Sequence, residues 1–303
     1  MDAAQTPVGV IGLGHMGSRV ASKLLEAGFD LRVWDRDAGT REALAGQGAT
    51  AASSPLDAAS GVAAAFSVLA DDDAVREIVL DGRVLDALPE SAVFADLSTT
   101  SIELARELAE AGSEAGVEVL DVEMSGSTPQ VEAGELVLLV GGSSETLERA
   151  RPFLTAISKT IVHLGGPGAG AIGKLVTNTL LGIGMEALAE GIALGEAAGL
   201  DRDRLLDMLD QLAVVAPAHK PKIALAREDK YPVAFALRLM SKDFGLALDL
   251  ARELGIQLPA TEASARIAAE ELEAATEDVD FAAVIRRMTR GVNDAPQARS
   301  TST

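Results

Sequence analysis

Apolar and polar positions along the first 165 residues form short blocks that predict a sheet covered by helices. Runs of Val, Ile, Leu, Ala and Phe predict buried strands, and several segments between them carry apolar side chains at helical spacing. The expected strands are 7–12, 31–34, 62–69, 92–96, 118–121 and 136–140, and the expected helices are 16–28, 41–47, 72–79 and 101–115. Strands that alternate with helices form mostly parallel sheets wrapped on both faces, so this part predicts an α/β domain.

The pattern changes after the segment Gly165-Gly166-Pro167-Gly168. From there on, only helical periodicity is visible, and no segment predicts a strand. The expected helices are 170–199, 202–212, 218–227, 234–254, 259–275 and 279–291. We therefore expect an all-helical domain over residues 167–292, followed by a polar, disordered tail over 293–303.

Composition narrows the class of protein and of partner. The chain has 303 residues, of which 48% are hydrophobic, so it can bury a sizeable core. Its net charge of −20 makes nucleic acid and anionic membranes unfavourable partners. The absence of cysteine excludes disulfides and thiolate catalysis, and the spacing of His15, His163 and His219 suggests no metal site. No signal peptide or membrane span is visible, so we expect a cytoplasmic protein.

A glycine-rich turn supplies the first candidate chemistry. The segment that joins the first expected strand to the first expected helix reads Gly12-Leu13-Gly14-His15-Met16-Gly17. In this setting Gly12 permits a tight turn, Gly14 lets the backbone approach a pyrophosphate, and Gly17 lets the helix pack closely on the strand. The alternative is a tight strand–helix turn without a ligand. We expect a Rossmann dinucleotide-binding domain over residues 1–166, with all six turn residues at the cofactor.

The end of the second expected strand bears on the choice of cofactor. Asp35 stands where an acidic residue accepts hydrogen bonds from the adenosine ribose, which favours NAD. Arg36 follows it directly and could bind the 2′-phosphate of NADP. The expected cofactor is therefore NAD or NADP, with NAD slightly favoured by Asp35.

Four segments together resemble the β-hydroxyacid dehydrogenase family, which includes 3-hydroxyisobutyrate dehydrogenase and glyoxylate/succinic semialdehyde reductases. Imine reductases share the same architecture. The segments are the glycine-rich turn with Ala27-Gly28, residues 121–127 with 133–136, residues 168–178, and residues 242–247. The resemblance implies a Rossmann domain followed by a helical domain like the C-terminal domain of 6-phosphogluconate dehydrogenase.

The resemblance also implies roles for individual residues. Lys174 matches the general acid/base, and Asn178 matches the group that orients the substrate and the lysine. The expected substrate loop contains Met124, Ser125, Gly126 and Ser127, and further cofactor contacts are expected at Leu69, Ala70, Ser98, Thr99 and Lys242. The implied reaction moves a hydride between nicotinamide and a β-hydroxy acid, a semialdehyde or a related small carbonyl compound. An ammonium group suits this chemistry, because it can stabilise the developing alkoxide and protonate it.

The substrate loop departs from the family pattern. The family usually shows glycine where this chain has Ser127, and a small or proline-containing run where it has Val122-Glu123-Met124. A larger carbonyl compound or an imine therefore becomes a plausible substrate. Two alternatives stay open: an NADPH-dependent imine reductase, against which Lys174 argues, and a non-catalytic scaffold that binds the cofactor. The apolar segment 170–199 also predicts a homodimer or higher homo-oligomer through the helical domain.

Overall fold

The structure is a computed structural model that describes residues 6–290. The chain divides into two compact units, residues 1–174 and residues 175–303, and the boundary falls inside one long helix. The tail predicted over 293–303 lies outside the described residues.

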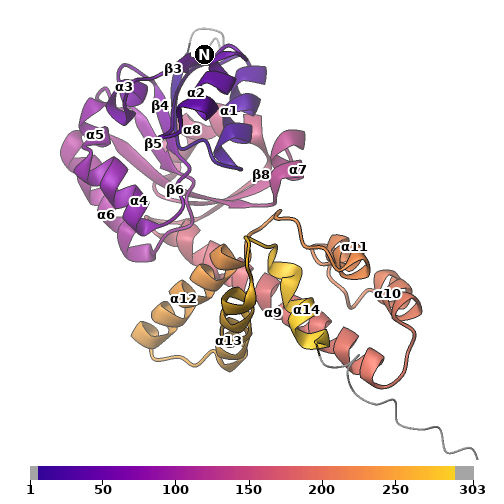
Figure 1. Cartoon of the computed structure of the whole chain (residues 1–303). Coiled ribbons are helices and arrows are strands. Elements are labelled where there is room, and N and C mark those ends of the chain that lie inside the picture. The colour runs from indigo at the N-terminus through magenta and orange to yellow at the C-terminus, as the bar shows by residue number, and fades with distance from the viewer. Residues whose placement is uncertain (1–5, 291–303) are drawn as a thin grey trace, which may run out of the picture. The chain divides into compact units, whose positions relative to one another are not determined.

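An eight-stranded sheet forms the centre of the first unit (Figure 1), and its strand order is β3-β2-β1-β4-β5-β6-β7-β8. Its strands are β1 (Pro7–Ile11), β2 (Asp30–Trp34), β3 (Thr50–Ala51), β4 (Ala64–Ser67), β5 (Val93–Asp96), β6 (Glu118–Ser125), β7 (Leu136–Gly141) and β8 (Ser158–Gly165). Neighbours pair in parallel except β6 and β7, which are antiparallel. The predicted mostly parallel sheet is confirmed, and so is the Rossmann-like arrangement. The strand order reverses between β1 and β4, the place where open α/β sheets bind their ligands.

Helices pack along the sheet of the first unit. They are α1 (Gly17–Glu26), α2 (Ala38–Ala45), α3 (Pro55–Ala59), α4 (Asp72–Val75), a π-helical turn η2 (Arg76–Asp81), α5 (Val84–Ala87), α6 (Ile102–Ala115), α7 (Thr128–Ala133) and α8 (Ser144–Ile157). Helices α3, α5, α7 and α8 and strands β3 and β8 are absent from the predicted elements. Most of these are short, and α8 contains Pro152, a residue that usually ends a helix.

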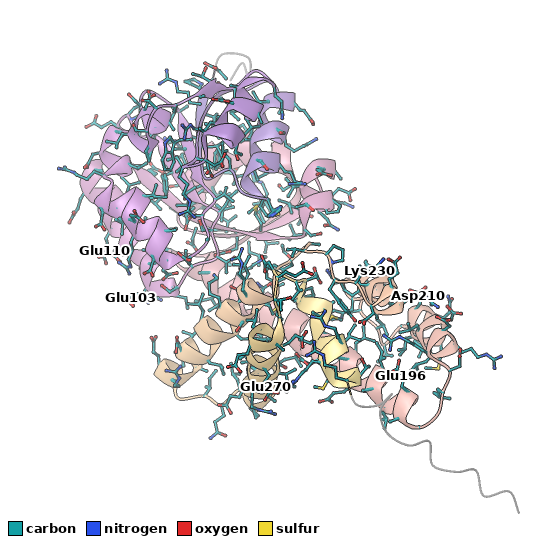
Figure 2. The ribbon with its side chains drawn as sticks, in the orientation of Figure 1. Glu103, Glu110, Glu196, Asp210, Lys230 and Glu270 are labelled. Atoms are coloured by element: carbon teal, nitrogen blue, oxygen red, sulfur yellow. The ribbon has the colours of Figure 1, made fainter. Side chains whose placement is uncertain are left out.

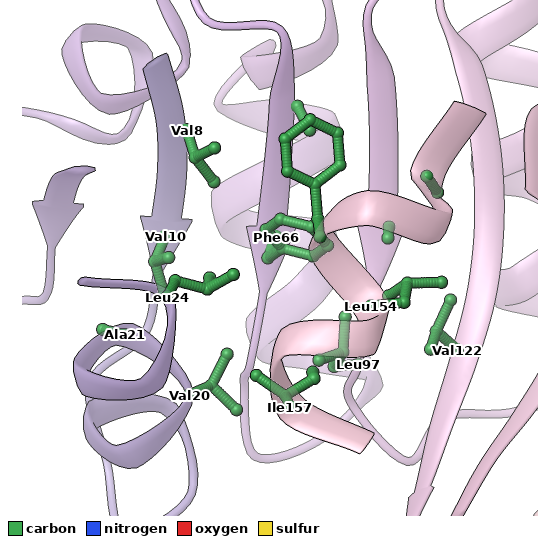
Figure 3. Close-up of a cluster of buried hydrophobic side chains, with 14 of the residues drawn as sticks. Val8, Val10, Val20, Ala21, Leu24, Phe66, Leu97, Val122, Leu154 and Ile157 are labelled. Atoms are coloured by element: carbon green, nitrogen blue, oxygen red, sulfur yellow. The ribbon is translucent and has the colours of Figure 1, made fainter. Parts of the chain in front are cut away.

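Apolar side chains cover both faces of this sheet. On one face Val10, Phe66 and Val122 meet Leu154 and Ile157 of α8 and side chains of α1 (Figure 3). A second cluster on other side chains of the same strands includes Ile11 and Phe94 with Leu104 and Leu108 of α6. Successive residues of a strand alternate between faces, so β1, β4 and β5 each contribute to both clusters.

The second unit is helical, as predicted. Its elements are α9 (Ala169–Ala197), which begins in the first unit, then α10 (Arg202–Gln211), α11 (Lys220–Glu228), α12 (Leu237–Leu254), α13 (Pro259–Ala274), a 3-10 turn η3 (Phe281–Ala283) and α14 (Val284–Thr289). An isolated β-bridge joins Ala236 to Asp280. Among residues 6–290, no helix has the length and apolar character needed to cross a membrane.

A buried ion pair ties the end of the second unit to its middle. Lys222 of α11 contacts both carboxylate oxygens of Asp280 at 2.8 Å. The same carboxylate accepts hydrogen bonds from the backbone N–H groups of Ala234 and Phe235, each at 3.0 Å. These contacts satisfy a charge that would be costly to bury alone. Elsewhere acidic side chains face outward, such as Glu103 and Glu110 on the outer side of α6 and Glu270 on α13 (Figure 2).

Glu186 of α9 is an acidic residue inside the second unit. Its side chain is buried, and its Oε2 atom has no hydrogen-bond partner among the described residues. Burial, reinforced by the nearby charge of Glu190, raises the pKa of Glu186 from 4.5 to about 8. The folded protein therefore keeps a proton on this carboxyl at neutral pH, and the unfolded chain releases it.

We expect Glu186→Gln to remove one component of the pH dependence of stability. Because the folded pKa of this acid is raised, its contribution to the unfolding free energy falls as pH rises from the unfolded value towards about 8. Between pH 5.5 and 7.5 the unfolding free energy of the wild type should fall by about 2–3 kcal/mol relative to that of Glu186→Gln. Urea unfolding of both proteins at each pH measures this difference.

Glu190→Gln is the matched control, since Glu190 lies one turn further along the same helix and is exposed. This variant should keep most of the wild-type pH slope. Parallel slopes for the wild type and Glu186→Gln would contradict the assignment.

Candidate functional site

The glycine-rich turn follows β1 and leads directly into α1. Gly12 has φ +94°, and a Cβ atom on it would lie 2.4 Å from the carbonyl oxygen of Val68. A Cβ atom on Gly17 would lie 2.0 Å from the carbonyl oxygen of Gly12. Gly14 differs, because nothing lies within 4 Å of its Cβ position. The first and third glycines therefore permit close packing, and the second leaves space open beside the backbone.

Backbone N–H groups of this turn are available to a ligand. The amide of Leu13 donates to Asp35 Oδ2 at 2.6 Å. The amides of Gly14, His15 and Met16 have no hydrogen-bond partner within residues 6–290. These amides precede the first turn of α1, where N–H groups and the helix dipole favour a phosphate. The residues present therefore fit the pyrophosphate of a dinucleotide.

Asp35 closes the turn from the end of β2. Its Oδ2 atom accepts from Leu13, and its Oδ1 atom accepts from the backbone N–H of Asp37 at 2.9 Å. The guanidinium of Arg41 donates to the Asp35 carbonyl oxygen. Arg36 is exposed and has no partner among the described residues. The carboxylate is thus fixed beside the turn, and no residue within 6–290 pairs with the neighbouring guanidinium of Arg36.

Two predicted cofactor loops are joined by one serine. Ser98 Oγ accepts from the backbone N–H of Leu69 at 2.8 Å and donates to Asp96 Oδ1 at 2.6 Å. Ser67 Oγ donates to the same carboxylate oxygen at 2.6 Å. Burial raises the pKa of Asp96 to about 6, although these hydrogen bonds favour the charged form. The loop after β4, which also contains Ala70, is therefore held against the loop after β5.

Strand β6 holds the start of α9 at two points. Asp121 accepts hydrogen bonds from the backbone N–H groups of Gly168 at 2.9 Å and Ala171 at 3.0 Å. Burial raises the pKa of Asp121, and these backbone hydrogen bonds oppose the shift. Three residues further along β6, the carbonyl oxygen of Met124 accepts from Lys174 Nζ at 2.5 Å. The proposed proton donor therefore rests on the residue that precedes Ser125.

The segment predicted as a substrate loop begins at the end of β6. Gly126 has φ +139°, a conformation that side chains rarely adopt. The hydroxyl and backbone N–H of Ser127 contact Gln130 Oε1 at 2.7 and 2.9 Å and cap α7. The Met124 side chain is buried in the core of the first unit, because alternate residues of β6 point to that face. Its carbonyl oxygen accepts from Lys174, whereas its side chain packs in the core and adds no exposed apolar surface to the loop.

Glu123 is a further polar residue that the sequence pattern did not single out for a role. Its side chain is 1% exposed, and Oε2 accepts from Thr99 Oγ1 at 3.0 Å. The signal in the sequence was a second carboxylate two residues after Asp121, placed between the apolar residues Val122 and Met124.

In the second unit, Asn178 and Lys242 converge on one carboxylate. Asn178 Nδ2 donates to Asp243 Oδ2 at 2.6 Å, and Lys242 Nζ lies 3.1 Å from Asp243 Oδ1. Asp243 is buried, so it fixes both neighbours. On α9, Asn178 follows Lys174 by one turn. Within residues 6–290, no cluster of His, Asp and Glu has the arrangement of a metal site.

Family models cover nearly the whole described chain. The model for the NAD binding domain of 6-phosphogluconate dehydrogenase matches residues 7–165. The model for NAD-binding of NADP-dependent 3-hydroxyisobutyrate dehydrogenase matches residues 168–288. The two matches meet close to the start of α9.

Known proteins are similar over almost the full length. Glyoxylate/succinic semialdehyde reductase 1 of Arabidopsis thaliana is 33% identical over 92% of this chain and 96% of its own. A 3-hydroxyisobutyrate dehydrogenase of Pseudomonas aeruginosa is 33% identical over 94% of this chain and 99% of its own.

Solved structures agree with these relatives. A 3-hydroxyisobutyrate dehydrogenase of Salmonella typhimurium superposes with a TM-score of 0.86 at 27% identity, covering 93% of this chain and 99% of its own. An imine reductase from Pseudomonas sp. shares the fold alone, with a TM-score of 0.60 at 20% identity over 94% of this chain and 99% of its own. The cofactor is NAD or NADP, as the sequence predicted. The chain belongs to the 3-hydroxyisobutyrate dehydrogenase family of NAD(P)-dependent oxidoreductases.

Proposed function

We propose that the protein interconverts a small β-hydroxy acid and its semialdehyde or keto form, with Lys174 as the general acid/base. One observation carries this proposal: Lys174 Nζ lies 2.5 Å from the carbonyl oxygen of Met124, directly before the Ser125-Gly126 loop. An ammonium at that place can hydrogen-bond a substrate carbonyl whose carboxylate rests on the loop. The relatives named as semialdehyde reductase and hydroxyisobutyrate dehydrogenase support the same substrate class.

Lys174 transfers one proton in each direction of the proposed reaction. When bound, the nicotinamide supplies or accepts the hydride. In the reductive direction the carbonyl carbon gains that hydride, and the carbonyl oxygen takes a proton from Lys174 Nζ, which becomes a neutral amine. Solvent then reprotonates the amine. In the oxidative direction the neutral amine accepts the hydroxyl proton. We assign Asn178 to the orientation of the substrate and the lysine, with Asp243 holding its amide.

We expect Lys174→Ala to lower kcat by several orders of magnitude, because the variant loses both the proton donor and the partner of the alkoxide. NADH binding, followed by fluorescence titration, should stay near the wild-type value, since the glycine-rich turn is unchanged.

Lys159→Ala serves as the control, because Lys159 is an exposed lysine on β8. Near-wild-type kcat for Lys174→Ala would remove Lys174 from the mechanism.

Turnover assays with panels of semialdehydes, β-hydroxy acids and cyclic imines distinguish two other functions. Faster turnover of cyclic imines than of any semialdehyde or β-hydroxy acid would favour an imine reductase, for which similarity of fold is the support. Tight NADH binding with no turnover on either panel would favour a non-catalytic scaffold. The position of Lys174 directly before the Ser125-Gly126 loop favours the dehydrogenase over both.

For the cofactor we propose NAD over NADP. Asp35 is held beside the turn by two backbone amides, and an ordered carboxylate there can accept from a ribose hydroxyl. The same carboxylate repels a 2′-phosphate, although the unengaged Arg36 offsets part of that repulsion.

We expect kcat/KM to be higher with NADH than with NADPH, by a few-fold to tenfold in line with one favourable hydrogen bond. Arg36→Ala should lower the use of NADPH further and leave NADH little changed. A hundred-fold preference of the wild type for NADPH would contradict the assignment.

We further propose a homodimer, or a higher homo-oligomer, that packs through α9. An apolar stripe follows this helix, and its large members are unusually exposed: Val176 is 57%, Leu180 69% and Leu194 72% exposed. Ile172 extends the stripe towards the start of the helix. A contiguous apolar face of this kind is typical of an interface between copies. A cytoplasmic location stays a prediction.

We expect light scattering at micromolar concentration to give at least twice the mass of the chain, and Leu180→Glu to shift the protein towards monomer by burying an unpaired charge. Leu254→Glu is the control, because Leu254 is comparably exposed but lies on α12. A monomeric wild type would contradict the proposal.

A further inference from the structure

Glu123 is a buried acidic residue on strand β6. Its neighbours Val122 and Met124 belong to the apolar core of the first unit. Its own side chain is almost fully removed from solvent and accepts a hydrogen bond from Thr99. A carboxylate buried in this way is costly unless other groups stabilise its charge. The position of Glu123 therefore calls for a physical reason.

The side chain of Glu123 lies on the face of β6 that receives the start of α9. Side chains two residues apart on a strand point to the same face, so Glu123 points to the side of Asp121. Asp121 contacts the first turn of α9 through the amides of Gly168 and Ala171. Glu123 therefore lies one step further along β6, just as Lys174 lies one turn further along α9.

The ammonium of Lys174 reaches the same point of β6. Its Nζ atom is 2.5 Å from the carbonyl oxygen of Met124, the residue that follows Glu123. Standard backbone dimensions then put Nζ within roughly 8 Å of the Glu123 Cα atom. From that Cα atom the side chain of Glu123 is long enough to bring its carboxylate closer to Nζ, and opposite charges a few ångströms apart favour each other's ionised forms.

Other charged groups also lie near this part of strand β6. Asp121 lies on the same strand, and Asp96 is its register partner on β5. Arg106 of α6 approaches the start of α9 at Gly168. Both aspartates have raised pKa values, so their negative charge is opposed by burial. Glu123 is the carboxylate closest in sequence to the atom that Lys174 contacts.

We propose that Glu123 is a positioning residue for Lys174: its buried carboxylate holds the lysine in the ammonium form, the form that protonates a substrate carbonyl. This inference rests on the proposed role of Lys174 as general acid/base. It assigns the site to carbonyl reduction over a wide pH range, because the proton donor stays charged as pH rises. Oxidation of the hydroxy acid, which needs the neutral amine, would then require more alkaline conditions.

The test is Glu123→Gln, which removes the charge but keeps the length of the side chain and an oxygen that can accept from Thr99. The pH dependence of kcat/KM is measured in both directions. In the reductive direction the alkaline limb should move to lower pH by about one unit, and in the oxidative direction the acid limb should move by the same amount. At a pH on the reductive limb this shift is about a tenfold loss.

The matched control is Glu118→Gln, which makes the same change of charge on the same strand. Glu118 lies about 17 Å from Glu123 along β6, at the spacing of an extended strand, and pairs with Arg149 at 2.6 Å. Both limbs should stay in place in this variant. Glu123→Asp, which keeps the charge, should return the limbs towards the wild-type pH.

The outcomes distinguish a positioning role of Glu123 from a structural role, and both from a failure of the proposed role of Lys174. A loss of activity in Glu123→Gln that is equal at every pH would overturn the inference and indicate a structural role. If this variant does not fold, Glu123→Leu, which suits an apolar strand, should give the same shift, and unmoved limbs there would overturn the inference. If the limbs persist in the residual activity of Lys174→Ala, they do not belong to Lys174, and the proposed function fails instead.

Discussion

The carboxylate of Asp121 fixes the start of helix α9 on strand β6, and the position of Lys174 depends on that contact. Asp121 accepts from the amides of Gly168 and Ala171, so the helix begins on the strand itself. A Cβ atom on Gly170 would lie 2.6 Å from the Asp121 carbonyl oxygen, so a larger residue would force strand and helix apart. One turn later, Lys174 reaches the end of the same strand. Lys174, the proposed proton donor, and the Ser125-Gly126 loop are therefore both positioned by strand β6.

The cofactor side is built on the same principle, because backbone geometry and buried hydrogen bonds position the polar groups. Gly12 and Gly17 permit a close turn before α1, and Asp35 closes it through the amide of Leu13. Ser98 links the loops after β4 and β5 through Leu69 and Asp96. All of these groups follow the carboxyl ends of parallel strands, where an open sheet presents its loops to a ligand.

The sequence predicted the fold more completely than it predicted the local geometry of the candidate site. The mostly parallel sheet and the helical second unit followed from periodicity, since apolar spacing distinguishes strands from long helices. Short elements such as α3, and α8 with its internal Pro152, were not predicted, because their apolar patterns are short or interrupted. The direction of Met124 and the burial of Glu123 depend on which face of β6 meets the core, and tertiary packing decides that. The link through Asp243 joins residues 65 positions apart, which no local pattern reveals.

The most direct test of this account is Asp121→Asn, which places an amide N–H group where two backbone N–H groups now donate. We expect kcat to fall about ten- to hundredfold, because the proposed proton donor would be displaced from the substrate. NADH affinity should stay close to that of the wild type, since the glycine-rich turn lies between β1 and α1. A folded Asp121→Asn variant with wild-type kcat would contradict the claim that this carboxylate positions Lys174.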